Sequence, residues 1–307
     1  MMEDFPVANF LQLLVYGLQL GSIYALLAIG YSMVFGIVRM INMAHCDFLM
    51  MGCYIVYFLV TVVFGGAEMI GPAVALLVIM IGSSAIGMVG VGIEAIAYRP
   101  LRSRPTIMCM ISAIGVSIFT QNLFRALPFI GPTPRHFPKL IPDQMIALGP
   151  VQISSARIVT ITLSIIIMII LYTFVQYSKI GMHMRAVSNN KDAASLMGVN
   201  INRVISMTFF IGAFLAAVSG SFYATSYPVV QPTMATTLGN KAFIAAVVGG
   251  IGDIRGAVLG GFLIGVTEIL VTSVWSDFAY GFCFLVLVVV LLFKPEGLLG
   301  KPTTEKV

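Results

Sequence analysis

The chain has 307 residues, of which 59% are apolar and only 9% carry a charge, and its mean hydropathy is +1.01. Soluble chains contain about 25% charged residues, so this composition argues against a water-soluble enzyme, a nucleic-acid-binding protein and a disordered scaffold. The net charge is +5, from 17 basic and 12 acidic residues, and we interpret it as loop charge that orients the chain in a membrane.

Long apolar runs follow one another, and a helix needs about 20 residues to cross a bilayer. The runs cover residues 10–38, 45–64, 71–98, 106–127, 158–177, 204–227, 256–274 and 278–293. They lack the alternating polarity of a membrane β-barrel. The sequence therefore predicts an all-α fold, a polytopic transmembrane helical bundle of about eight to nine spans. Residues 1–307 would form a single membrane domain.

A ninth apolar run, 241–252, is too short for an ordinary span. Basic clusters at 99–104, 179–203 and 294–306 indicate the cytoplasmic side. This assignment places the acidic N-terminal residues outside. It places the C-terminus inside only if 241–252 dips fully into the membrane or crosses it as a short, broken helix. No basic residue precedes Arg39, so we expect no secretory signal peptide. The proline-rich segment 128–157 predicts an extended, non-helical outer cap.

Polar residues stand at the edge of the second run, at Asn42, His45 and Asp47. Charged groups at this depth are costly and face protein or water, so all three are candidates for a pathway through the bundle or its gate. A polar break that fixes the helix start is the favoured interpretation, and a proton relay is the alternative. The remaining histidines lie in distant loops, which argues against a metal site.

Isolated acidic residues also occur within the apolar runs. Glu94 lies one turn before Arg99, and we expect it to pair with nearby arginine. Glu268 lies deep in the run 256–274 and is a functional candidate, for a substrate pathway or for ion coupling. A pairing with Lys241 or Arg255 explains Glu268 equally well.

No arrangement of serine, cysteine, histidine and aspartate suggests a catalytic site, and we expect neither enzymatic activity nor a cofactor. The cysteines have no CxxC spacing and lie in apolar stretches. We expect them to be small buried side chains rather than disulfide partners or metal ligands. They are Cys46, Cys53, Cys109 and Cys283.

The cytoplasmic loop 178–203 is predicted to contain a short helix. Asn190 suits its N-cap, Asp192 its first turn and Gly198 its end. The apolar positions 193, 196 and 197 share one face, and an exposed apolar face needs a partner. A connector lying on the membrane surface is the alternative.

Clustered glycines follow the short run, at Gly249, Gly250 and Gly252. No strand precedes them, so a nucleotide-binding loop is disfavoured. The cluster favours a broken or re-entrant helix or close helix packing, and a tight cytoplasmic turn is the alternative. These glycines join the candidate pathway or gating residues.

Short motifs recur in a fixed order along nearly the whole chain: GSIYAL at 21–26, GYSMVFG at 30–36, NMAH at 42–45, AYRPLR at 97–102, SAIGVSI at 112–118, KAF at 241–243, GGIG at 249–252 and FKPEGLLG at 293–300. Residues at 181–200, from Gly181 to Asn200, add a further set. In this order the chain resembles the permease subunits of branched-chain amino acid ABC importers, the LivH type. Each motif alone is weak, and their shared order and spacing carry the resemblance.

The resemblance implies a permease in the bacterial inner membrane that translocates leucine, isoleucine or valine. Its implied partners are a second related permease, two cytoplasmic ATPase subunits and an extracytoplasmic binding protein, with lipid around it and no nucleic acid. ATP would be hydrolysed by the partners, which would drive alternating access. The loop 178–203 would be the coupling segment, with these ATPase-coupling residues: Arg185, Asn190, Asp192, Ala193, Ala194 and Gly198.

Two residues depart from the family pattern. Cys46 stands where glycine is usual, and Arg255 where proline or a small residue is common. The resemblance therefore does not define the local backbone conformation at either position. Related permeases carry urea, short amides or other amino acids, so these substrates remain alternatives. An ion-coupled secondary transporter that uses Glu268 and Asp47 is a further alternative, although no internal repeat supports it. A channel or a structural membrane scaffold is the last alternative for the function.

Overall fold

The computed structural model describes residues 7–65, 71–141, 144–148 and 151–300. Within them, eight helical segments are long and apolar enough to cross a membrane. They contain α1 (Val7–Val38), α2 (His45–Val63), α3 (Pro72–Ile93), α4 (Thr106–Ala126), α5 (Ser155–Tyr177), α8 (Ile201–Ser226), α10 (Ile254–Val274) and α11 (Ala279–Phe293). The prediction of a polytopic all-α bundle is confirmed.

Shorter elements connect these helices. Two of them, α6 (Lys179–Asn189) and α7 (Lys191–Leu196), lie between α5 and α8. A π-helical turn (Glu94–Tyr98) and a 3-10 turn (Arg99–Leu101) extend α3, and a 3-10 turn (Ser276–Phe278) precedes α11. Strand β1 (Arg135–His136) pairs antiparallel with β4 (Val229–Val230), and β2 (Met145–Leu148) with β3 (Val151–Ser154). Strands at 135–136, 145–148 and 151–154 agree with the predicted extended cap, but the predicted end at 157 is wrong, because α5 already begins at Ser155.

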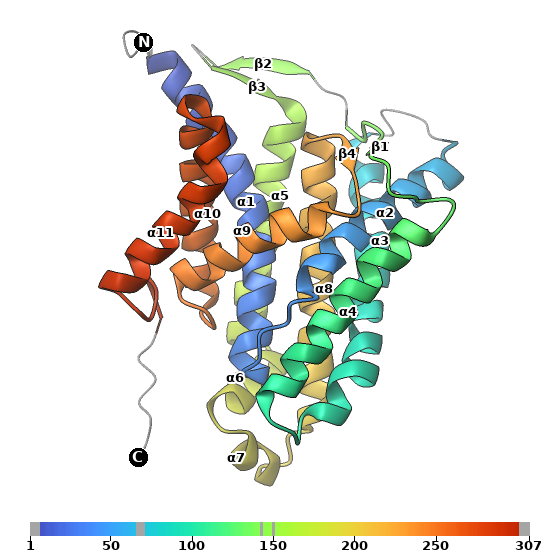
Figure 1. Cartoon of the computed structure of the whole chain (residues 1–307), viewed down its shortest axis with the longest axis vertical. Coiled ribbons are helices and arrows are strands. Elements are labelled where there is room, and N and C mark those ends of the chain that lie inside the picture. Colours follow the sequence, from blue (N-terminus) through green and yellow to red (C-terminus); the bar gives the residue numbers. More distant parts are fainter. Residues whose placement is uncertain (1–6, 66–70, 142–143, 149–150, 301–307) are drawn as a thin grey trace.

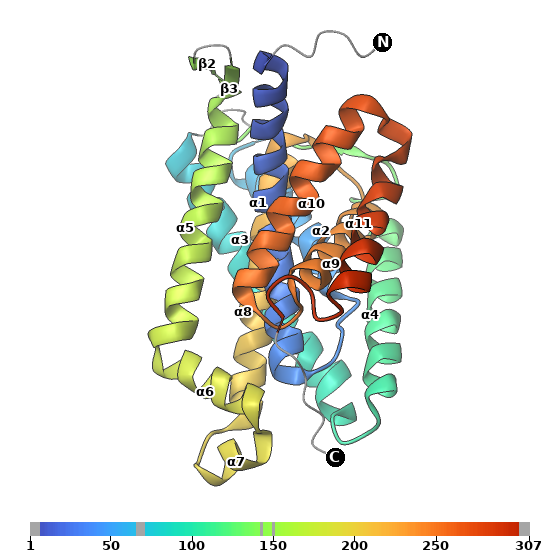
Figure 2. The same ribbon diagram turned by 90° about the vertical axis from the view of Figure 1, so that its left-hand side faces the viewer.

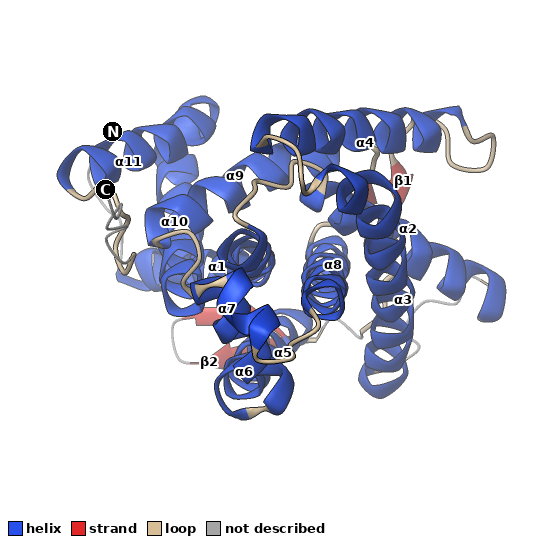
Figure 3. Ribbon diagram, turned by 90° about the horizontal axis from the view of Figure 1, so that it is seen from below, coloured by secondary structure: helices blue, strands red, loops and turns tan. Residues whose placement is uncertain are grey.

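Helices α1 and α8 form the centre of the bundle. The apolar stretch of α1 is 89% buried and that of α8 72%, against 17% for α4 and 11% for α11. Viewed from below, α1 and α8 lie inside, with α4, α11 and α5 near the rim (Figure 3). Small residues allow α1 and α10 to approach closely, because a side chain at Gly261 would collide with the backbone of Ala25.

The short apolar run 241–252 belongs to α9 (Met234–Gly249), a helix of 16 residues. It lies obliquely across the bundle and packs against α1, α2, α10 and α11 (Figure 1). It leads from β4 toward the end of the bundle that carries α6 and α7. The helix begins earlier than the apolar run because its first half contains Thr236, Thr237 and Asn240.

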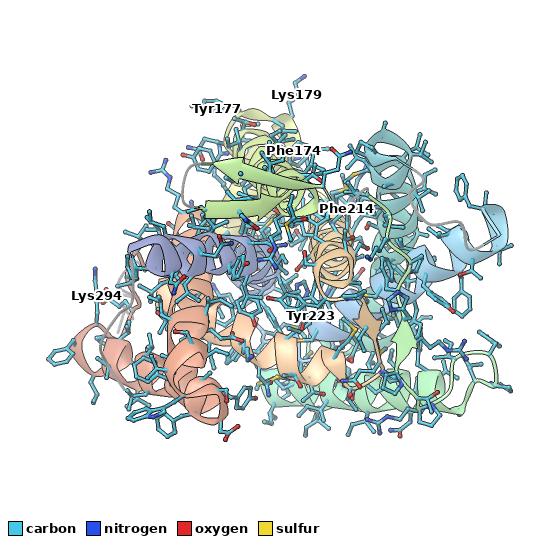
Figure 4. The ribbon with its side chains drawn as sticks, turned by 90° about the horizontal axis from the view of Figure 1, so that it is seen from above. Phe174, Tyr177, Lys179, Phe214, Tyr223 and Lys294 are labelled. Carbon is cyan, nitrogen blue, oxygen red and sulfur yellow. The ribbon has the colours of Figure 1, made fainter. Side chains whose placement is uncertain are left out.

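The two ends of the bundle differ in charge. Helices α6 and α7 and the turn between α3 and α4 lie at one end, and β2, β3 and the start of α1 at the other (Figures 1 and 2). The basic clusters 99–104 and 179–203 thus share one end, which we treat as cytoplasmic. Seen from above, Tyr223 of α8 lies near the centre, whereas Lys179 lies at the upper margin and Lys294 at the left margin (Figure 4).

Polar caps explain why α8 and α10 begin before their apolar runs. The Asn200 side chain accepts a hydrogen bond from the Arg203 amide at 3.1 Å. The Asp253 side chain accepts bonds from the amides of Arg255 and Gly256, at 2.8 and 3.2 Å. Capped first turns carry polar residues, so hydropathy alone places the helix start too late.

Candidate functional site

The turn between α1 and α2 brings polar groups into the interior. Asn42, His45 and Asp47 are each 1% exposed. The Asn42 Oδ1 atom accepts hydrogen bonds from the Ala44 amide at 3.1 Å and from the Tyr98 hydroxyl at 2.9 Å. Asn42 therefore holds the turn that precedes α2 and joins it to the π-helical turn that extends α3.

Asp47 connects three helices. Its Oδ1 atom accepts a hydrogen bond from Gln121 Nε2 of α4 at 2.9 Å, and Thr236 of α9 donates to Gln121 Oε1 at 3.4 Å. Its Oδ2 atom has no hydrogen-bond partner among the described residues, and neither has His45 Nε2. Buried polar atoms without partners are costly, so both residues remain candidates for a functional role.

A cavity of about 430 Å³, which we name the α4–α9 cavity, lies beside these residues. Apolar side chains form most of its wall, and Ser117, Gln121, Thr236 and Asn240 supply polar groups. Part of its wall comes from α4 and α11, whose apolar stretches are only 17% and 11% buried. A mostly apolar cavity with a few polar groups is typical of a site for a small molecule. Sequence reasoning missed Gln121, although a polar residue within the run 106–127 is a usable signal.

Glu268 forms an ion pair inside the bundle. Lys241 Nζ of α9 lies 2.6 Å from Glu268 Oε1, and both side chains are 12% exposed. The Tyr24 hydroxyl of α1 donates to Glu268 Oε2 at 2.9 Å. Of the expected partners, Lys241 makes the contact, whereas Arg255 donates to the Tyr172 hydroxyl and stacks on its ring. Both carboxylate oxygens of Glu268 have partners, and these contacts join α10 to α9 and α1.

The glycine cluster forms the turn between α9 and α10. Gly250 and Gly252 have φ angles of 109° and 98°, which other residues rarely adopt. The C-terminal segment 294–300 returns to this turn: the Leu298 amide donates to the Val248 carbonyl at 2.8 Å, and the Leu299 amide to the Gly249 carbonyl at 2.9 Å. The tight-turn alternative therefore describes these glycines.

Both departures from the family pattern lie within regular helix. Cys46 belongs to α2, where its Sγ atom contacts the Tyr31 hydroxyl and packs against Gly239 of α9. Glycine at position 239 leaves the room that the Cys46 side chain needs. Arg255 lies in the first turn of α10. All four cysteines are buried and free, as expected.

The cytoplasmic loop contains the predicted helix, α7. The Asn190 side chain accepts a hydrogen bond from the Ala193 amide at 3.0 Å, and Gly198 ends the segment with a φ of 82°. Leu196 and Met197 are 89% and 84% exposed, so the predicted apolar face is open. Figure 2 shows α6 and α7 at one end of the molecule.

The other coupling candidates divide into exposed and packed residues. Asp192, Ala193 and Gly198 are exposed. Ala194 is only 4% exposed, so the expectation that its side chain lies on the docking surface is corrected. In a helix of six residues, the face opposite Leu196 packs on the bundle. Arg185 donates to the carbonyls of 175 and 176 and so caps the end of α5.

Glu94 pairs with arginine, as expected. It is fully buried and accepts from Arg99 at 3.0 Å and from Arg102. The Ser206 hydroxyl of α8 also donates to Glu94, at 2.7 Å, a partner that sequence reasoning missed. This network fixes the turn after α3 against α8. No group of three or more metal-binding side chains occurs within the described ranges.

Comparison with known proteins identifies the family. The family described as "Branched-chain amino acid transport system / permease component" matches residues 13–291. The chain is 39% identical to the high-affinity branched-chain amino acid transport system permease protein BraD of Pseudomonas aeruginosa, over 98% of this chain and 99% of the relative. It is 39% identical to the corresponding LivH protein of Escherichia coli K12, over 97% of this chain and 98% of the relative.

A more distant relative, the ribose import permease protein RbsC of Haemophilus influenzae, is 28% identical over 37% of this chain and 38% of its own length. No solved structure matches the chain significantly. The eight apolar helical segments and the family match describe a multi-pass inner-membrane protein. The chain belongs to the family of permease components of branched-chain amino acid transport systems.

Proposed function

We propose that this chain is the permease subunit of an ABC importer that moves leucine, isoleucine or valine into the cell. The observation that carries the proposal is the similarity, over nearly the full length, to permeases named for the transport of these amino acids. ATP hydrolysis on partner subunits would supply the energy, and an extracytoplasmic binding protein would deliver the substrate.

The α4–α9 cavity is our candidate for the substrate pathway. Its apolar wall suits a branched aliphatic side chain, because such a side chain gains about 1.5–3 kcal/mol on full burial. Gln121 and Asn240 offer amide groups for the charged ends of an amino acid. The cavity is lined by α4 and α11, the two least buried spans, so in our proposal a second permease subunit would pack against them and close the pathway.

The candidate gate lies at the cytoplasmic end of α1. Gly252 packs close to Gly36, since a side chain at Gly36 would come within 3.3 Å of the Gly252 carbonyl oxygen. In our proposal, the turn between α9 and α10 separates from α1 when the pathway opens inward. The exposed face of α7, with Leu196 and Met197, would transmit the ATPase movement. The docked segment must bind two ATPase states with different affinity, because otherwise no equilibrium shifts.

Co-purification tests this assembly. The tagged chain is extracted gently from its native membrane, and the accompanying proteins are identified. We expect a second permease and two ATPase subunits. A lone chain, with amino acid uptake that collapses with an uncoupler and survives ATP depletion, would contradict the proposal and favour an ion-coupled transporter. An ABC assembly that carries urea or a short amide would retain the mechanism and correct the substrate.

A further inference from the structure

A second cavity lies at the cytoplasmic end, away from the α4–α9 cavity. It has a volume of about 530 Å³ and is bounded by the turn after α1, the turn between α3 and α4, and the start of α7 and α8. Its charged lining residues are Arg39, Arg102, Arg104 and Lys191. No acidic residue is among the described residues that line it. We name it the basic cavity.

The charges in the basic cavity are only partly compensated. Arg102 pairs with the buried Glu94, which also binds Arg99. The Arg104 guanidinium group has no hydrogen-bond or ion-pair partner in the described part of the chain. Lys191 Nζ donates to the Val38 carbonyl at 3.2 Å, a neutral acceptor. Three segments that are distant in sequence therefore bring an excess of positive charge together.

Two further observations indicate that bringing these positive charges together costs free energy. Arg39 has a φ of 60°, and it is the only residue other than glycine with positive φ in the described ranges. Such backbone strain concentrates at functional sites. Burial, followed by the neighbouring charges of Arg102 and Arg39, lowers the pKa of Lys191 below its ordinary value. Cations that repel one another in this way are stabilised by a bound anion.

We propose that the basic cavity binds a phosphate group from the cytoplasmic side. A multiply charged oxyanion matches several cations at once, and the planar fork of arginine suits phosphate oxygens. Asn200 and Asn202 also line the cavity and supply amide donors. The bound group would connect Lys191, at the start of α7, to Arg39 and Arg104. Its occupancy would stiffen α7 relative to the bundle.

The phosphate group can come from a free anion or from a lipid headgroup, and the experiment separates these sources. The full chain, with the subunits that co-purify, is placed in nanodiscs of phosphatidylcholine. Binding of radiolabelled inorganic phosphate tests the free anion. Retention of phosphatidylglycerol, measured by native mass spectrometry, tests the headgroup. The variant is Arg104→Gln, since Arg104 is exposed and unpaired, and Lys179→Gln is the matched control at the margin of the same end.

We expect Arg104→Gln to weaken binding of one probe by about tenfold, the effect of one charge-assisted contact, and Lys179→Gln to leave it unchanged. If Arg104→Gln loses phosphate binding, the ligand is a free anion. If it loses phosphatidylglycerol retention, the ligand is a lipid headgroup. The proposal fails if neither probe binds the unaltered chain, or if both variants weaken binding equally. Neither result depends on which amino acid the permease transports.

Discussion

The ion pair between Lys241 and Glu268 supports a prediction that separates a structural link from an ion-coupling site. The Nζ and Oε1 atoms lie 2.6 Å apart, and each side chain is 12% exposed, with Glu268 in the span α10 and Lys241 in the short helix α9. The substitution Lys241→Met leaves the Glu268 carboxylate with the Tyr24 hydroxyl as its hydrogen-bond partner. Breaking a buried pair on one side destabilises a protein by roughly 3–5 kcal/mol, because a charge remains buried and unpaired.

The double variant Lys241→Met/Glu268→Gln removes both charges, so we expect it to recover most of the stability lost in Lys241→Met. The free energy of unfolding is measured by denaturation in mixed micelles for both single variants and the double variant. Amino acid uptake should follow the same order. The reasoning is refuted if the double variant is as unstable as Lys241→Met. A stable Glu268→Gln variant without uptake, which the second substitution does not rescue, would instead identify Glu268 as a functional acid.

Further substitutions test the packing, the turn before α2 and the docking face. Gly249→Val should remove the folded peak in size-exclusion chromatography, because the backbone of α10 occupies the space that a side chain at 249 would need. The control Gly115→Val has open space around it and should give the folded peak. Asn42→Ala should cost about 1–3 kcal/mol in unfolding free energy, because the Ala44 amide and the Tyr98 hydroxyl lose their acceptor, and no loss would contradict its role in the turn before α2. Leu196→Ser should reduce ATP-driven uptake at least tenfold, while its free energy of unfolding stays within about 0.5 kcal/mol of the unaltered chain. The control Met182→Ser changes another exposed apolar residue and should retain uptake.

Local features of the fold were predictable from the sequence. Apolar runs of span length predicted α1 to α5, α8, α10 and α11, because a bilayer demands continuous low polarity. The cap at Asn190 and the stop at Gly198 predicted α7, since these residues act on their own backbone neighbourhood. Hydropathy places the polar starts of helices too late along the chain, because caps and first turns are hydrophilic.

The contacts between distant segments were not predictable in the same way. Asp47 meets Gln121 across 74 residues, and Lys241 was one of two expected partners for Glu268. Only the packing of α2, α4, α9 and α10 decides these pairs. Burial of Ala194 likewise depends on how α7 sits on the bundle, which helical periodicity alone leaves open. The basic cavity combines residues from three segments that are distant in sequence, so no local sequence pattern predicts it.

Uptake into vesicles tests whether this chain imports branched-chain amino acids at the expense of ATP. The complex that co-purifies with the chain is reconstituted, loaded binding protein with radiolabelled leucine is added on one side, and ATP on the other. We predict leucine accumulation that requires ATP, persists with an uncoupler and is competed by isoleucine and valine. Leucine accumulation without ATP, driven by a proton gradient and abolished by the uncoupler, would contradict the account.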